Sequence, residues 1–200
     1  MFMQPPKPSL VVIAGFSASG KSTLAKALSH RSEFRDFQVI GSDHIRRDLW
    51  AQMNDGARPQ TLPKEAYLDP EFKQCHYEIV ADIAKNALNS GQSVILHGTM
   101  TDDVVMPALK DFTSENAMPF IPLWLDVPEG ELKRRIENRE DTDGSDANAA
   151  VLDGQLQKGR PHHEFQFLDG ELHHHFLADT VAGMFPSYQP VMIRMPSFEH

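Results

Sequence analysis

The sequence predicts an α/β fold, a three-layer αβα sandwich in which a central, mainly parallel five-stranded sheet lies between helices. Short apolar runs rich in β-branched residues alternate with helical patterns along the chain, which is typical of a parallel sheet. A glycine-rich stretch separates the first such run from the first helix. The 200 residues suit one domain (1–200), with a core at about 9–128 and 170–200 and a helical lid at about 134–160.

The first predicted unit is a strand over 10–15, a loop, and a helix from 21 to about 31. The loop, residues 15–22, matches the P-loop pattern G-x-x-x-x-G-K-[ST]. When a strand, a glycine-rich loop and a helix follow one another, successive backbone N–H groups of the loop and the helix N-terminus can face a polyphosphate. The motif therefore predicts a P-loop NTPase fold and a nucleotide site. Its expected residues are Gly15, Ser17, Ala18, Ser19, Gly20, Lys21, Ser22 and Thr23.

The residue types of this loop have distinct physical tasks. Gly15 and Gly20 permit backbone angles and a close approach that a Cβ would obstruct. Lys21 can place its ammonium against the β- and γ-phosphates, and the Ser22 hydroxyl can ligate a phosphate-bound Mg²⁺. ATP and Mg²⁺ are thus the expected cofactors. The alternative, a glycine-rich turn without a ligand, does not require a lysine followed by a hydroxyl at the helix start.

The second predicted strand, 37–41, leads to Asp43, the best candidate for a catalytic base. A kinase must remove a proton from the attacking hydroxyl, and a carboxylate within hydrogen-bond reach can accept it. In the predicted helix 44–53, Arg46 lies three residues after Asp43 and thus on the same helical face. Arg46 can hold an anionic part of the acceptor or the transferring phosphoryl group. The alternative is that Asp43 is a helix cap paired with an arginine.

A loop with two prolines is expected over 54–68, followed by the longest helix of the chain. Asp69 is its predicted N-cap, Pro70 its first residue, and Ser90-Gly91 its end. The single cysteine, Cys75, lies beside the apolar stripe of this helix, and we expect it to be a core residue. One cysteine excludes an intramolecular disulfide and fits a reducing compartment.

The next predicted elements are strand 93–96, helix 103–113 and strand 120–125. Pro107 is expected as a kink or an early-turn residue, and Pro122 predicts that its strand begins late. Ligands of an open parallel sheet bind beyond the carboxyl ends of the strands. The P-loop, Asp43, His97-Gly98-Thr99 and Asp126 should therefore converge on one crevice. Residues that bind the acceptor are expected in the loops 54–68, 98–106 and 159–170.

A cationic helix is predicted over 129–139, before the polar segment 140–145. A mobile arginine that closes on the transferred phosphoryl group is a recurrent catalytic device, with Arg135 and Arg139 as the leading candidates. The alternative is a solvated helix face. Further elements are predicted as a helix capped by Ser145 or Asp146 that runs to about 158, a helix over 170–185, and a fifth strand over 190–195.

Two features restrict the partners of the chain. The net charge of −9 disfavours non-specific nucleic-acid binding, which needs a basic surface, and favours a small acceptor. The histidines 162–163 and 173–175 lack zinc-type spacing, so surface or partly buried structural roles are expected. No apolar run approaches the length of a membrane span, and residues 1–9 do not read as a signal peptide. We therefore expect a cytoplasmic protein.

Over about residues 9–160, the sequence resembles small P-loop kinases of the polynucleotide kinase, zeta-toxin and gluconate-kinase type. It is especially similar to ATP-binding kinase domains that are fused to aminoglycoside-phosphotransferase-like domains. The resemblance implies that Asp43 is the base for the acceptor hydroxyl and that Arg46 contacts the substrate. The residues that carry the resemblance are 15–22, 42–46, 93–96, 125–128, Arg139, 145–147 and 151–155.

One residue departs from the family pattern, which usually places Asp-x-Thr after the third strand. The triplet here is His97-Gly98-Thr99, and a neutral imidazole cannot supply the charge of a carboxylate near Mg²⁺. Four functions therefore remain open. They are a kinase for a hydroxyl on a small molecule, a polynucleotide 5′-hydroxyl kinase, a nucleotide-binding protein with little kinase turnover, and a toxin-type kinase for nucleotide sugars.

Overall fold

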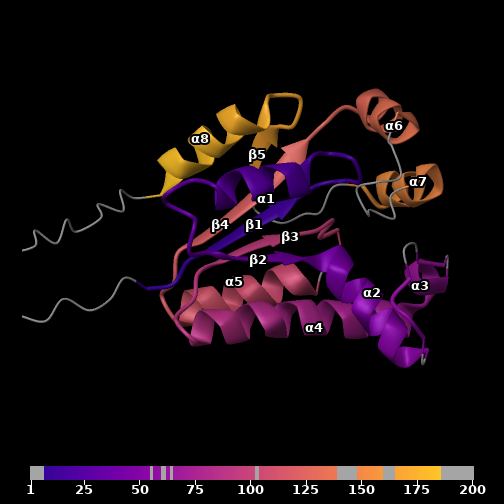
Figure 1. Cartoon of the computed structure of the whole chain (residues 1–200), viewed down its shortest axis with the longest axis horizontal. Helices are drawn as coiled ribbons and strands as arrows, with labels where there is room; N and C mark the ends of the chain where they lie inside the picture. The colour runs from indigo at the N-terminus through magenta and orange to yellow at the C-terminus, as the bar shows by residue number, and fades with distance from the viewer. Residues whose placement is uncertain are drawn as a thin grey trace, which may run out of the picture.

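A parallel five-stranded sheet forms the centre of the molecule (Figure 1). The computed structural model describes residues 7–54, 56–59, 62–63, 65–101, 104–138, 148–159 and 165–185. The strand order is β2-β3-β1-β4-β5, and the neighbouring strands run parallel. The strands are β1 (Leu10–Ala14), β2 (Gln38–Gly41), β3 (Val94–His97), β4 (Phe120–Asp126) and β5 (Gln166–Asp169).

Helices cover both faces of the sheet, so the predicted αβα sandwich is confirmed. In Figure 1, α1 and α8 lie over one face, and α4 and α5 lie over the other. The remaining helices, α2, α3, α6 and α7, lie towards the end of the sheet where the strands point. The helices are α1 (Lys21–Ser29), α2 (Ser42–Met53), α3 (Glu65–Leu68), α4 (Pro70–Asn89), α5 (Val105–Glu115), α6 (Glu129–Glu137), α7 (Ala149–Lys158) and α8 (His174–Met184).

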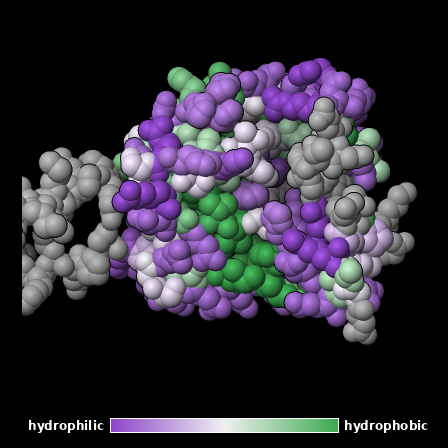
Figure 2. Space-filling view, viewed as in Figure 1, coloured by the Kyte–Doolittle hydropathy of each residue, from purple (hydrophilic) through white to green (hydrophobic). Residues whose placement is uncertain are grey.

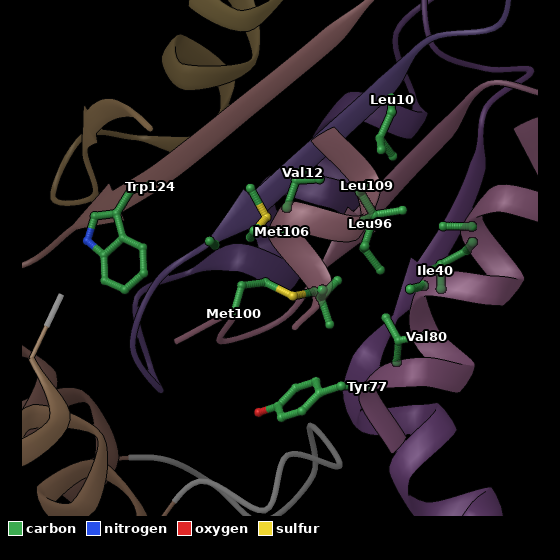
Figure 3. Packing of buried hydrophobic residues seen from close by; sticks show 14 of the residues in the cluster. Leu10, Val12, Ile40, Tyr77, Val80, Leu96, Met100, Met106, Leu109 and Trp124 are labelled. Atoms are coloured by element: carbon green, nitrogen blue, oxygen red, sulfur yellow. The ribbon is translucent and has the colours of Figure 1, made fainter. Parts of the chain in front are cut away.

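The central strand β1 is buried on both faces, as its uninterrupted apolar sequence requires. Successive side chains of a strand point to opposite faces, so Leu10 and Val12 join one apolar cluster while Val11 and Ile13 join the other. Figure 3 shows the first cluster, in which β1 and β3 side chains lie near those of α5. On the face seen in Figure 2, polar side chains predominate around one apolar area.

The fifth strand is not where the sequence predicted it. Gln166–Asp169, which was expected to be loop, pairs with β4 as the fifth strand of the described sheet, and the predicted strand 190–195 lies outside the described residues. This strand is short, and only Leu168 among its residues is buried. An edge strand with one buried side chain has no periodic signal, which explains why its residues were assigned to a loop.

The prediction that β4 begins late is wrong, because the strand starts at Phe120 and contains Pro122. Leu10 N donates a hydrogen bond to Pro119 O. Because alternate peptide groups of a strand face opposite neighbouring strands, this register turns the nitrogen of Pro122 away from β1. On that other side, β5 pairs with β4 only from Leu123 onward. The proline therefore lies where no ladder hydrogen bond is required.

The helix starts confirm one predicted cap and correct another. The Asp69 carboxylate accepts hydrogen bonds from Glu71 N at 2.9 Å and Phe72 N at 3.3 Å, as predicted for an N-cap. Residues 145–147 lie outside the described residues, but α7 is capped by Asn148, which accepts from Val151 N at 3.0 Å, so the predicted cap at Ser145 or Asp146 is wrong.

Two further helical features bear on the predictions. Pro107 is the third residue of α5, and the early-turn alternative is therefore correct. The short helix α3 lies within the segment predicted as loop. Among the described helices, none combines the length and the apolar character that a bilayer span needs.

Candidate active site

The carboxyl ends of four strands meet at one edge of the sheet, as predicted. In the parallel register, Ile13 of β1 and Gly41 of β2 both pair with His97 of β3, and Ala14 pairs with Trp124 of β4. The P-loop, Asp43, Thr99 and Asp126 begin or lie within two residues of these positions. Segments that are far apart in the sequence therefore surround one site.

The P-loop has the strained backbone that its glycines predict. Gly15, Ala18 and Gly20 all have positive φ angles, of 149°, 63° and 96°. A Cβ on Gly15 would lie 2.7 Å from Ser19 Oγ and 3.0 Å from Leu125 O, so a larger residue would force the loop away from β4. Gly20 is the N-cap of α1 and supplies no side-chain cap, which leaves backbone N–H groups of the first turn for an anion.

Lys21 lies under this loop rather than in solvent. Its side chain is buried, and Nζ donates to Phe16 O at 2.7 Å and lies 3.5 Å from Ser19 Oγ. The ammonium is therefore held in the concavity of the loop, where the β- and γ-phosphates of a nucleotide would reach it. Ser22 and Thr23 are exposed in the first turn of α1, so their hydroxyl groups are accessible to phosphate or to a metal ion.

Asp43 and Arg46 form an ion pair in the first turn of α2. Arg46 Nη1 lies 2.8 Å from Asp43 Oδ1; the arginine is buried and the carboxylate is half-buried. Burial by itself would raise the pKa of Asp43, but the charges of Arg46 and Lys21 hold this pKa below its usual range. The carboxylate is therefore ionised at neutral pH, and the positive charge of the P-loop lysine helps to stabilise this ionised form.

The guanidinium of Arg46 also lies over an aromatic ring. Its Cζ is 5.4 Å from the centre of the Tyr67 ring, which belongs to α3. The residues of α3 thus help to orient the side chain that pairs with Asp43.

The start of α2 is fixed by residues that sequence reasoning missed. His76 of α4 is fully buried, and its Nε2 lies 3.0 Å from Ser42 O and 3.2 Å from Ser42 Oγ. A Cβ on Gly98 would lie 2.7 Å from Ser42 Cβ, so only glycine allows β3 and α2 to approach this closely. The available signal was the position of His76 on the apolar stripe of the longest helix, where a buried histidine needs a polar partner.

His97, the last residue of β3, is uncharged at neutral pH. Burial lowers the pKa of His97 to about 4, although the charge of Asp43 opposes this shift. A Cβ on Gly41 would lie 3.0 Å from the imidazole of His97, so the ring packs against the end of β2. The end of β3 therefore presents a neutral ring to the site.

Of the cations on α6, Arg135 is the one that the structure brings to the P-loop among the described residues. Its Nη1 donates to Ala18 O at 3.4 Å and its Nη2 donates to Gly170 O at 3.2 Å, while Nε donates to Glu131 at 2.7 Å. Arg134 is 64% exposed and pairs with Glu131. Arg139, the other predicted lid arginine, lies outside the described residues.

A cavity of about 280 Å³ opens beside the P-loop, on the side of α1 and α8. Sequence reasoning missed the part of its wall that follows β5, because that strand itself was not predicted. A Cβ on Gly170 would lie 2.4 Å from Val127 Cγ2, so this turn approaches β4 closely. The lining residues are Ser19, Gly20, Thr23, Leu24, Leu125, Arg135, Gly170, Glu171, Leu172, His173, His174 and Leu177.

Comparisons with known proteins agree with this architecture. A sequence profile for a protein family, described as an AAA domain, matches residues 10–162. A search of curated proteins found no match to the chain.

Several solved kinases are similar in structure at low sequence identity. An unliganded sugar kinase from a Janibacter species is 19% identical, with a TM-score of 0.62, over 88% of this chain and 93% of that one. A gluconokinase from Sinorhizobium meliloti is 15% identical, with a TM-score of 0.56, over 88% and 90%. The APS kinase of Mycobacterium tuberculosis, in complex with AMPPNP and APS, is 17% identical, with a TM-score of 0.62, over 90% and 98%. These likenesses establish the fold.

Proposed function

The chain belongs to this AAA-domain family, and from that premise we propose that it is an ATP-dependent kinase that phosphorylates a hydroxyl group of a small molecule. One observation carries the proposal. The parallel register brings the P-loop after β1 and Asp43 after β2 to the same edge of the sheet, where the charges of Arg46 and Lys21 keep the pKa of Asp43 low, so an ionised candidate base lies near the expected position of the γ-phosphate. The similar folds of a sugar kinase, a gluconokinase and an APS kinase support it.

In the proposed reaction, Asp43 accepts the proton of the acceptor hydroxyl. The hydroxyl oxygen then bonds to the γ-phosphorus, and the bond from the γ-phosphorus to the β–γ bridging oxygen breaks, which leaves ADP. Lys21 and the N–H groups of the P-loop hold the phosphates, and Arg135, which donates to Ala18 O of the loop, can oppose developing negative charge. Arg46 orients the Asp43 carboxylate through a hydrogen bond, and its guanidinium can also contact an anionic part of the acceptor.

The residues at the start of α1 fit a Mg²⁺ ion that rests mainly on the nucleotide. Mg²⁺ prefers oxygen ligands and keeps several waters, and Ser22 presents an exposed hydroxyl there. In the described part of the chain, no group of three or more His, Cys, Asp or Glu side chains is arranged to hold a metal ion. When bound, the ion would neutralise charge on the β- and γ-phosphates.

The cavity beside the P-loop is the proposed site of the nucleotide base. It adjoins the phosphate loop through Ser19 and Gly20, and the apolar side chains of Leu24 and Leu177 contribute to its wall. A planar base fits a cleft that combines apolar walls with a few polar groups. The phosphates would then extend from this cavity along the loop towards Lys21.

A second candidate function is nucleotide binding with little phosphoryl transfer. The neutral His97 favours it, since the site lacks the carboxylate that would help to organise the metal ion. The net charge of −9 gives no comparable support to a polynucleotide acceptor.

The two candidates are separated by measuring ATP consumption with a panel of sugars, nucleosides and aminoglycosides. We expect at least one acceptor to stimulate turnover, and we expect Asp43→Ala to lower that stimulated rate by roughly a hundredfold or more. Binding of ADP to the variant should persist, because Asp43 does not belong to the P-loop. Equal stimulated rates for both proteins would exclude Asp43 as the base. If no acceptor acts on the wild type but His97→Asp gains turnover, the nucleotide-binding function is the better description.

A further inference from the structure

The side-chain amide of Gln155 joins α7 to the P-loop and to the segment that follows β3. Ser17 N donates to Gln155 Oε1 at 2.8 Å, although the two residues are 138 positions apart. The Nε2 group of the same amide points to Thr99 Oγ1 at 3.5 Å, just beyond the end of β3. Ser17 is buried, so its N–H depends on this contact.

The apolar core fixes α7 in this place. Leu152, one turn before Gln155, is fully buried and belongs to the same cluster as Phe16 of the P-loop and Trp124 of β4. Leu156 is partly buried against that cluster. The contact between Gln155 and the P-loop therefore rests on packed side chains of the helix rather than on a lone surface hydrogen bond.

The peptide unit between Phe16 and Ser17 is held from both sides. Its carbonyl oxygen accepts from Lys21 Nζ at 2.7 Å, and its N–H donates to Gln155. The β- and γ-phosphates of a nucleotide compete with that carbonyl for the lysine ammonium. Once the ammonium moves to phosphate, the carbonyl oxygen keeps its hydrogen bond from Ser19 N at 3.2 Å, and Gln155 continues to hold the N–H side of this peptide unit.

We propose that Gln155 is a positioning residue for the γ-phosphate, which fixes the Phe16–Ser17 peptide of the P-loop and couples α7 to the number of phosphates bound. This inference rests on the proposed nucleotide binding. A neutral amide can accept the Ser17 N–H without repelling the phosphates. A carboxylate of the same shape would keep the hydrogen bond but add a negative charge at the γ-phosphate end of the site.

The test compares the affinities of the full chain for Mg·ADP and Mg·AMPPNP by calorimetry. In Gln155→Glu, the Kd of AMPPNP should rise by roughly tenfold more than the Kd of ADP, as expected for one added charge within about 8 Å of another. The matched control is Gln157→Glu, which adds the same charge at an exposed position of the same helix. There, the two Kd values should keep the wild-type ratio.

Gln155→Leu provides a second variant that adds no charge and does not depend on the glutamate variant being folded. It removes the hydrogen bond to Ser17 N, and it should weaken AMPPNP relative to ADP by roughly three- to tenfold. A purely structural role would lower the melting temperature and shift both affinities equally. An unchanged ratio of the two Kd values in both Gln155 variants would overturn the inference. If the wild type binds neither nucleotide, the proposed function fails instead.

Discussion

His97 should make the protein less stable in mild acid, by an amount that follows from its pKa. Burial lowers the pKa of His97 to about 4, from 6.5 for an ordinary histidine. Between these values the unfolded chain binds a proton that the folded state excludes. Stability that is present above pH 6.5 is therefore lost as the pH falls through this window. From this group alone, the free energy of unfolding should drop by about 2 kcal/mol between pH 7 and pH 5, and by about 3 kcal/mol by pH 4.

The assay is urea denaturation of the wild type and of His97→Gln at pH 7, 6 and 5. Glutamine keeps a polar side chain of similar length but does not titrate, so the variant should lose about 2 kcal/mol less than the wild type over this range. His30→Gln, at an exposed histidine, serves as the control and should follow the wild type. If His97→Gln loses as much stability as the wild type between pH 7 and pH 5, the imidazole is not held neutral by the fold.

Three further perturbations test other parts of the site. Gly98→Ala places a Cβ 2.7 Å from Ser42 Cβ and should displace the start of α2, so acceptor-stimulated turnover should fall while the calorimetric Kd of ADP stays unchanged. Arg135→Lys cannot span Ala18 O and Gly170 O with one ammonium, so nucleotide affinity should fall by roughly three- to tenfold, whereas the exposed Arg134→Lys should leave it unchanged. Leu152→Ala empties a fully buried position and should cost about 2–5 kcal/mol in urea denaturation; a loss below about 1 kcal/mol would contradict its place in the core.

The P-loop part of the candidate site could be predicted because its pattern is local in the sequence. The P-loop places a strand, glycines, a lysine and a helix start within a few residues, and each has a recognisable pattern. Asp43 could be proposed in the same way, because it lies two residues after the predicted strand 37–41 and three residues before Arg46. The parallel sheet then brings these positions to one edge without further information.

The rest of the site depends on contacts that no local pattern encodes. The hydrogen bond between Ser17 and Gln155 joins residues 138 positions apart, and His76 reaches Ser42 across 34 positions. The wall of the cavity after β5 could not be placed, because a four-residue edge strand with one buried side chain resembles a loop. These contacts depend on how the helices pack against one another. Hydrophobic periodicity in the sequence predicts only which face of each helix is apolar, and not which residues it will contact.

The two halves of the site should therefore respond differently to substitution. The half around the expected β-phosphate consists largely of backbone groups and of Lys21, which contacts Phe16 O in the same loop. The other half takes its geometry from distant helices: His76 of α4 contacts Ser42 on the Asp43 side, and Gln155 of α7 contacts Ser17 on the proposed γ-phosphate side. A change in either helix can move the Asp43 side or the γ-phosphate side of the crevice while the β-phosphate cradle stays intact. Because phosphoryl transfer needs the acceptor oxygen and the γ-phosphorus in line, such changes should lower turnover before they lower affinity for ADP.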